Sequence, residues 1–235
     1  RNPVIEAIKN DREIDKIMIA NSAKEGSIKK IIGMAKEKNI VIQYVDKHKL
    51  DEVSTSHSHQ GVIAQVSEYK YWELDELIES VKAKNEDPFF IILDEITDPH
   101  NLGSIIRTAD AAGVDAIIAL KGCVDIYNPK VIRSTMGSIF DMNVIHATQE
   151  EALRILKLKK FDIVSSYLDT NNYYNTVEYN YKTALVIGNE ANGINEELVS
   201  KSDVLVKIPI YGKAESLNAA ISSAILMYEI KKYLV

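Results

Sequence analysis

Three stretches of this sequence place glycine and asparagine beside a charged or hydroxyl residue just after an apolar segment ends. The apolar segments span residues 89–93, 184–187 and 204–208. Each is typical of a buried strand, and open α/β sheets bind ligands beyond the carboxyl ends of their parallel strands. We therefore expect the three stretches to meet in one composite site.

The last stretch breaks at Pro209 and Gly212, and a helix is expected from Ser216. Backbone N–H groups lack partners at a helix start, and Ser216 and Asn218 add directional donors and acceptors there. Small residues follow them, so a ligand can approach this helix closely. An ordinary strand–loop–helix connection with side-chain capping is the alternative interpretation.

The first stretch carries Asn101, Gly103 and Arg107 at the start of an expected helix. Arg107 lies less than two helical turns after Asn101, so both side chains can reach one ligand. Gly103 permits close approach to the helix. The glycine spacing matches neither the dinucleotide-binding pattern nor the phosphate-binding loop, which excludes the two commonest nucleotide sites.

In the second stretch an apolar strand ends at Gly188, and Glu190 stands in the turn that follows. A carboxylate at a strand end is costly to bury unless it has a cationic or hydrogen-bonding partner. Arg107 is the expected partner. A solvated turn glutamate is the alternative interpretation for Glu190 taken alone.

The elements that must position these residues follow from apolar periodicity. In the first part of the chain, helices are expected at 2–10, 26–38 and 47–53 and strands at 14–20, 40–45 and 61–66. After a charged helix at 74–84, strands are expected at 89–93, 115–120, 143–147, 161–166, 184–187 and 204–208, with helices at 102–112, 129–137, 150–159, 195–200 and 216–233. This alternation predicts a parallel sheet with helices on both faces. We place a linker at 71–88, between a domain at 1–70 and a domain at 89–235.

Charge is distributed unevenly along this chain of net charge −6. Residues 1–70 hold 12 basic and 10 acidic side chains, whereas residues 71–235 hold 16 and 24. Only the N-terminal part is therefore compatible with a polyanion such as RNA. No apolar run approaches the roughly 18–20 residues of a membrane helix, and we expect no membrane association. A single cysteine and the absence of a visible secretion signal indicate a cytoplasmic protein.

Two further features have a plain interpretation. His57 and His59 lie in a loop without Cys, Asp or Glu, so we expect no metal site there. A polar loop that contacts RNA, or a turn that ends at Gly61, is favoured instead. Cys123 is expected to be a buried small side chain rather than a nucleophile.

Taken together, the three stretches resemble the motifs of the SpoU/TrmH family of RNA ribose 2′-O-methyltransferases. The matching patterns are Asn101-x-Gly103-x-x-x-Arg107-Thr108, Ile187-Gly188-Asn189-Glu190-x-x-Gly193, and Ile208-Pro-Ile followed by Ser216-Leu217-Asn218. The resemblance covers residues 89–230, and residues 1–70 resemble the small RNA-binding domain of one subgroup, with landmarks at 1–7 and 59–61. Many relatives have Val-Ser where this chain has Ala219-Ala220, which removes a hydroxyl but no motif residue.

The resemblance implies a fold, a cofactor and a set of site residues. The implied fold is an α/β protein of SPOUT type, whose C-terminal parallel-sheet domain is tied in a deep trefoil knot behind a small N-terminal α/β RNA-binding domain. Backbone groups at Gly188, Ile208 and Leu217 would hold S-adenosyl-L-methionine. The side chains implied around the ribose are Asn101, Arg107, Glu190, Ser216 and Asn218. Relatives are generally homodimers, so a partner chain can complete each site.

The implied reaction methylates a ribose 2′-hydroxyl of RNA, and the expected target is a guanosine of 23S rRNA. Arg107 is either the base that removes the hydroxyl proton or a cationic clamp that stabilises the developing alkoxide. Alternative functions are a tRNA methyltransferase, an rRNA adenosine methyltransferase that confers antibiotic resistance, a catalytically silent RNA-binding protein and a small-molecule nucleotide enzyme. Intact Arg107, Glu190 and Asn218 argue against the silent protein.

Overall fold

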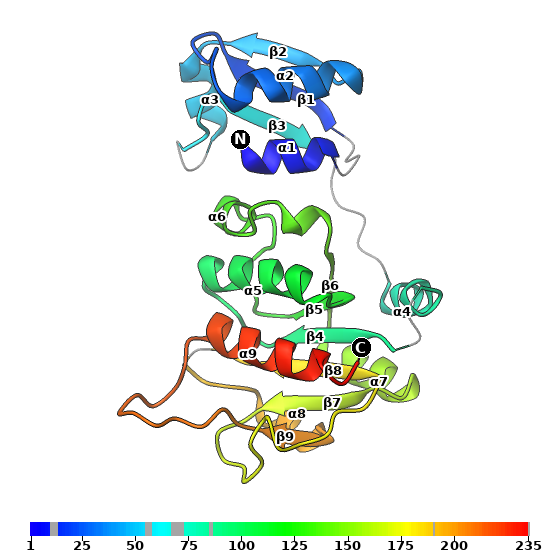
Figure 1. The fold of residues 1–235 in the computed structure, drawn as a ribbon. Helices are drawn as coiled ribbons and strands as arrows, with labels where there is room; N and C mark the ends of the chain where they lie inside the picture. The colour runs from blue at the N-terminus through cyan, green and yellow to red at the C-terminus, as the bar shows by residue number, and fades with distance from the viewer. Residues whose placement is uncertain (10–13, 55–57, 67–72, 85–86, 190, 235) are drawn as a thin grey trace. The chain divides into compact units, whose positions relative to one another are not determined.

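The computed structural model describes residues 1–9, 14–54, 58–66, 73–84, 87–189 and 191–234. The chain forms two compact units, each with its own sheet (Figure 1). One comprises Arg1–Lys70 and Thr135–Asp141, and the other comprises Tyr71–Ser134 and Met142–Val235. No helix within the described ranges is long and apolar enough to cross a membrane.

The first unit is a three-stranded sheet packed against short helices. Its elements are α1 (Asn2–Lys9), β1 (Ile14–Ala20), α2 (Ser27–Glu37), β2 (Ile42–Val45), α3 (Lys47–Val53), β3 (Val62–Val66) and the short 3-10 helix η1 (Ser138–Phe140). Strand β1 is central, parallel to β2 and antiparallel to β3. The core includes Ile5, Ile8, Ile17, Ile19, Ile28 and Ile31. The predicted order of helices and strands in residues 1–70 is confirmed, and the antiparallel pairing of β3 makes this sheet mixed.

The second unit is built on a six-stranded sheet in the order β6-β5-β4-β8-β7-β9. Its elements are α4 (Leu74–Lys82), β4 (Phe89–Leu93), α5 (Pro99–Ala112), β5 (Ala116–Leu120), α6 (Pro129–Ser134), β6 (Asn143–Ala147), α7 (Gln149–Leu158), β7 (Asp162–Ser166), β8 (Thr183–Ile187), α8 (Glu196–Lys201), β9 (Val204–Val206) and α9 (Ala219–Lys231). Every strand pair of this sheet is parallel. The parallel sheet predicted from the alternating pattern is therefore confirmed.

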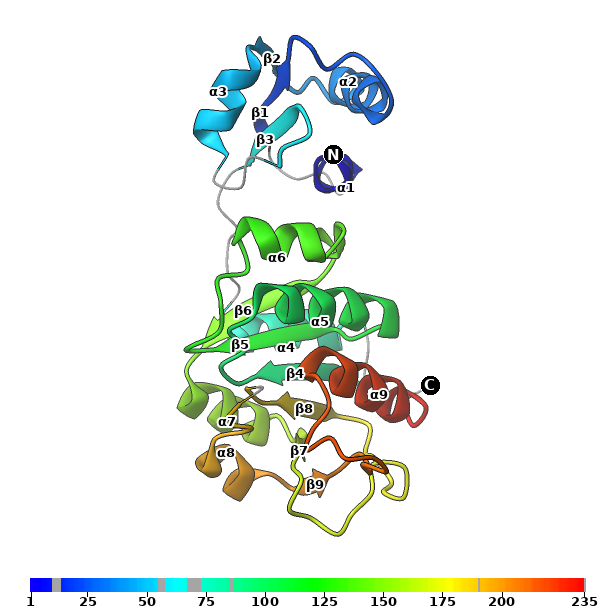
Figure 2. The same ribbon diagram turned by 90° about the vertical axis from the view of Figure 1, so that its left-hand side faces the viewer.

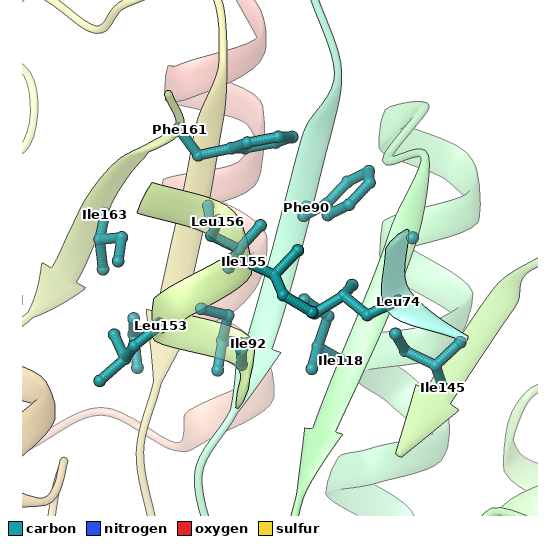
Figure 3. Close-up of a cluster of buried hydrophobic side chains, with 14 of the residues drawn as sticks. Leu74, Phe90, Ile92, Ile118, Ile145, Leu153, Ile155, Leu156, Phe161 and Ile163 are labelled. Carbon is teal, nitrogen blue, oxygen red and sulfur yellow. The ribbon is translucent and has the colours of Figure 1, made fainter. Parts of the chain in front are cut away.

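Alternate residues of each strand point to opposite faces of the second sheet, so both faces present apolar side chains. Helices cover both faces. On one face, Phe90 and Ile92 of β4 pack with side chains from α4 and α7 (Figure 3). The rings of Phe90 and Phe161 pack there with their centroids 5.0 Å apart. Helices α5 and α9 lie side by side and cover the other face (Figure 2).

Helix α4 shows that the segment expected to be a linker contributes to a folded core. Its buried side chains Leu74, Leu77, Ile78 and Val81 belong to the same apolar cluster as Phe90. The helix itself confirms the expectation at 74–84, although it ends at Lys82. Residues 71, 72, 85 and 86 of this segment lie outside the described residues.

Two helices of the candidate site begin at other residues than the sequence analysis predicted. Helix α5 begins at Pro99, because Oδ1 of Asp98 accepts hydrogen bonds from the N–H groups of His100 and Asn101, both at 2.8 Å. Helix α9 begins at Ala219 rather than at Ser216, because Asn218 is its N-cap. In each case the capping side chain fixes where the helix starts.

Candidate functional site

Asn101 and Asn218, from the first and third motifs, are joined by a side-chain hydrogen bond. Nδ2 of Asn218 donates to Oδ1 of Asn101 over 2.9 Å. Oδ1 of Asn218 accepts from the N–H groups of Ala220 and Ile221 at 3.0 and 3.3 Å, which caps α9. Both ends of the Asn218 amide are therefore engaged, and the start of α9 is tied to the first turn of α5.

Arg107 lines an open hollow of about 390 Å³ on the face of the second unit that carries α5 and α9. Its other lining residues are Ser104, Thr108, Ala111, Ser134 and Tyr228. The Arg107 side chain is exposed and makes no hydrogen bond or ion pair with any residue that the structure describes. Asn101 is not among the described residues that line this hollow. The pairing expected between Arg107 and Glu190 is untested, because Glu190 lies outside the described residues.

Gly103 lets α6 approach α5 closely. A Cβ atom at this position would lie 2.3 Å from Cβ of Ser134 and 2.9 Å from the carbonyl oxygen of Val131. Oγ of Ser134 also lies 3.2 Å from Nδ1 of His100, which joins the two helices again. The close approach expected at Gly103 is thus made by another helix of the same chain, and it forms one wall beside the Arg107 hollow.

Gly188 directly follows β8 and packs against the backbone of Gly193. A Cβ atom there would lie 2.4 Å from the backbone of Gly193. Asn189 and Gly193 exchange two backbone hydrogen bonds of 2.9 Å, and Oδ1 of Asn189 accepts from the N–H groups of Ala191 and Asn192. Asn189 and Gly193 are therefore held close together. Any larger residue at position 188 would displace the loop, so such a substitution cannot by itself report on a ligand.

Asp94 and Glu95, which the sequence analysis did not single out, tie the end of β4 to this loop. Oδ2 of Asp94 accepts a hydrogen bond from the backbone N–H of Asn195 over 2.7 Å, and the carbonyl oxygen of Glu95 accepts from Nδ2 of Asn189 over 2.8 Å. Asp94 is buried, and this burial raises the pKa of its carboxyl group. The sequence did carry a signal for this role. Asp94 and Glu95 directly follow the apolar run 89–93, and polar residues just beyond a buried strand often hold neighbouring loops.

The segment from Ile208 to Leu217, after β9, has no regular secondary structure. Its main-chain groups form no hydrogen bond with the rest of the described chain. Ser216 and Leu217 are exposed, and Tyr211 has 94% of its surface exposed. This segment therefore offers donors and acceptors of the backbone to a ligand, together with apolar side chains.

Cys123 is half-buried rather than fully buried as the sequence analysis expects. Sγ of Cys123 lies 3.3 Å from the carbonyl oxygen of Leu93, and burial raises the pKa of this thiol to about 11. The thiol is therefore protonated at neutral pH, as expected for a residue that is not a nucleophile. His57 lies outside the described residues, and the part of the chain that is described holds no cluster of three metal-ligating side chains.

Comparison with known proteins identifies the family. A model of the SpoU rRNA Methylase family matches residues 88–228, and a model described as RNA 2′-O ribose methyltransferase substrate binding matches residues 1–72. The chain belongs to the SpoU rRNA methylase family. As a member it is an S-adenosyl-L-methionine-dependent RNA 2′-O-methyltransferase of TrmH type, and the resemblance drawn from the three motifs is confirmed at the level of the family.

Similar SpoU-family proteins match nearly the whole chain. The putative TrmH family tRNA/rRNA methyltransferase YacO of Bacillus subtilis is 40% identical over 231 residues, which cover 98% of this chain and 92% of that protein. The AdoMet-bound rRNA methyltransferase of Sinorhizobium meliloti is 26% identical with a TM-score of 0.82, covering 100% of this chain and 86% of that chain. The TrmH/SpoU tRNA modifying enzyme of A. aeolicus is 27% identical with a TM-score of 0.56, covering 67% of this chain and 84% of that chain.

Proposed function

We propose that this SpoU-family enzyme methylates the ribose 2′-hydroxyl of a guanosine in 23S rRNA. The observation that supports rRNA over tRNA is the extent of the structural match. The similarity to the Sinorhizobium meliloti rRNA methyltransferase includes the N-terminal unit, whereas the A. aeolicus tRNA modifying enzyme matches only 67% of this chain. The choice of guanosine rests on the resemblance of the chain as a whole to the bacterial enzymes that methylate a guanosine of large-subunit rRNA.

In this proposal residues 1–70 dock the RNA, residues 89–235 carry the reaction, and 71–88 connect them. Backbone groups at Gly188, Ile208 and Leu217 hold S-adenosyl-L-methionine, which supplies the methyl group when bound. The unpaired main chain of 208–217 fits this role, since a nucleoside and an amino-acid group both need backbone donors and acceptors. We further propose that this segment forms the trefoil knot of the family.

Asn101, Arg107, Glu190, Ser216 and Asn218 surround the ribose in the proposed complex. The reaction forms a bond between the 2′-oxygen and the methyl carbon, breaks the bond between that carbon and sulfur, and releases the hydroxyl proton. Positioning contributes heavily to such an in-line transfer. A guanidinium is cationic throughout the pH range of proteins, so Arg107 acts as a clamp on developing negative charge more readily than as a base.

Labelled S-adenosyl-L-methionine and separate pools of rRNA and tRNA test the substrate class directly. We expect label in 23S rRNA, at one guanosine whose 2′-O-methyl group stops primer extension at low nucleotide concentration. Label confined to tRNA, or at an adenosine of 23S rRNA, would replace the proposed target by one of the alternatives. Absence of label from every RNA pool, with cofactor bound, would point to the silent RNA-binding protein.

We also propose that the enzyme acts as a homodimer that uses the exposed face of α9. Ile221 and Tyr228 lie seven positions apart on this helix and are 55% and 53% exposed. Residues at this spacing share one helix face, and exposed apolar faces of this kind mark interaction sites. Tyr228 also lines the Arg107 hollow, so a second copy on this face would cover Arg107.

Replacing Ile221 with glutamate is expected to convert the dimer into a monomer and to abolish most methylation, because a carboxylate would be buried in an apolar contact. Light scattering measures the mass, and a rate assay measures the activity. Leu158→Glu is the matched control, since Leu158 is 69% exposed on α7, away from α9. A wild-type protein that is monomeric at assay concentrations and fully active would rule the dimer out.

A further inference from the structure

The first unit contains an open polar hollow that the reaction described above does not use. It has a volume of about 750 Å³, and its lining includes Arg1, Ser22, Lys47, Ser58 and Gln60. A second hollow of about 620 Å³ shares Arg1 and Ser22 with it and adds Lys24 and Glu25. Both lie where the loops after β1 and before β3 meet, at one end of the three-stranded sheet.

Arg1 holds these two loops together. Its Nε donates to the carbonyl oxygen of Gln60 over 3.0 Å, and its Nη1 lies 3.5 Å from the carbonyl oxygen of Glu25. Gly61 brings the loops closer still, because its φ is 82° and a Cβ atom there would lie 2.8 Å from Cβ of Ala23. The guanidinium is therefore placed between two hollows by ordered backbone.

His59 fixes the turn on which Gln60 stands. Its side chain is 4% exposed, and its Nδ1 accepts a hydrogen bond from the backbone N–H of Gly61 over 3.0 Å. Nδ1 is therefore the acceptor nitrogen of the ring, and Nε2 donates to Oδ1 of Asp51 over 3.0 Å. Both ring nitrogens are engaged within the protein, so His59 orders the wall of the hollow and is not a ligand-binding group.

The charges around the hollows favour an anion. Arg1, Lys24 and Lys47 line them, against the single carboxylate of Glu25 among the described lining residues. A base splayed out of an RNA strand needs an aromatic face or a guanidinium plane to stack on. His59 is the one aromatic ring among the described lining residues, and its side chain is buried and engaged, so Arg1 offers the guanidinium plane on which a base could stack. The surplus of cations favours a phosphate group, and a base stacked on Arg1 is the outcome that the sequence dependence of binding separates from it.

We propose that the hollow around Arg1 and Lys47 binds a phosphate of the RNA backbone. This inference rests on the proposed function, since it names the contact through which the N-terminal unit docks the substrate. A phosphate contact positions an RNA without reading its sequence. Substitutions in the hollow therefore weaken binding of all RNAs alike and leave the methylated position unchanged.

The test measures RNA affinity of the full chain as a function of salt for wild type, Lys47→Gln and Lys49→Gln. Lys49 is the matched control, because it lies on the same short helix, pairs with Glu52 at 2.9 Å and does not line the hollow. Lys47→Gln is expected to lose about tenfold in affinity at low salt, as for one charge-assisted hydrogen bond. The slope of log affinity against log salt falls by about 0.7–0.9, the value for one phosphate.

Arg1→Gln is expected to weaken binding more than Lys47→Gln, because it removes a cation and also the link between the loops. Cofactor affinity stays at the wild-type value in both variants, which separates this inference from the proposed reaction. An unchanged salt slope for Lys47→Gln, or a loss that depends on RNA sequence, would overturn the phosphate site. If no RNA is methylated while Lys47→Gln still lowers the slope, the proposed function fails and the phosphate contact stands.

Discussion

Replacing Arg107 with alanine is expected to lower the single-turnover rate of methyl transfer by about 10²–10³, the usual loss for one well-placed charged donor. Arg107 lines an open hollow and is not paired with any described residue, so its removal leaves no buried charge behind. Folding and cofactor affinity should therefore be unchanged. The measurement is a single-turnover assay with labelled cofactor, with calorimetry for cofactor binding.

Arg107→Lys then separates the two roles proposed for this side chain. A cationic clamp keeps part of its effect in lysine, which preserves the charge without the planar fork, whereas a base that depends on the guanidinium loses nearly all of it. Arg154→Ala is the control, because Arg154 is an exposed arginine on α7, which packs on the other face of the sheet. A folded, cofactor-bound Arg107→Ala enzyme with the wild-type rate would remove Arg107 from the site.

Strands β4, β5 and β8 were predictable because each is a short, largely apolar run between polar breaks. Phe89–Leu93 is buried along its whole length, and a strand buried on both faces is apolar without alternation. The order β6-β5-β4-β8-β7-β9 was not predictable from these runs, because it depends on which distant strands pair. Pairing of β4 with β8 joins residues about ninety positions apart, and nothing local in either strand specifies it.

The predicted starts of α5 and α9 differ from the observed ones, because each has more than one residue that could serve as the N-cap or first turn. Asp98 followed by Pro99 is a strong start signal, yet the motif drew attention to Asn101 in the first turn of the same helix. At the other helix, Ser216 and Asn218 can both cap, and the hydrogen bonds from the N–H groups of Ala220 and Ile221 to Oδ1 of Asn218 show which is used. Local propensity leaves this choice open, because both residue types are good caps.

The motif glycines predict a close approach but do not identify the group that approaches. The resemblance implies that backbone groups at Gly188 hold the cofactor, and the space that a side chain would need there is filled by the backbone of Gly193. Gly103 likewise admits α6. Sequence shows that something approaches closely, whereas only the fold shows whether it is a ligand or the chain itself.

Replacing Asn218 with serine is expected to lower the rate of methyl transfer by about 10² with little loss of stability. Serine caps a helix about as well as asparagine, so the cap of α9 is kept. Serine has no amide to donate to Oδ1 of Asn101, so the 2.9 Å link between the first and third motifs is lost. A displacement of about 1 Å at reacting groups is enough for a rate loss of this size.

Asn195→Ser provides the matched control, because Asn195 caps α8 by accepting from the N–H of Glu197 over 2.9 Å and makes no such link through its side chain. Thermal unfolding should show similar small shifts for both serine variants, and only Asn218→Ser should lose rate. A double-mutant cycle with Asn101→Ala completes the test. If the two asparagines act through their mutual hydrogen bond, the double variant is no slower than the slower single variant. Rate losses that simply multiply would show that each asparagine acts on the substrate independently, and the link would then be structural only.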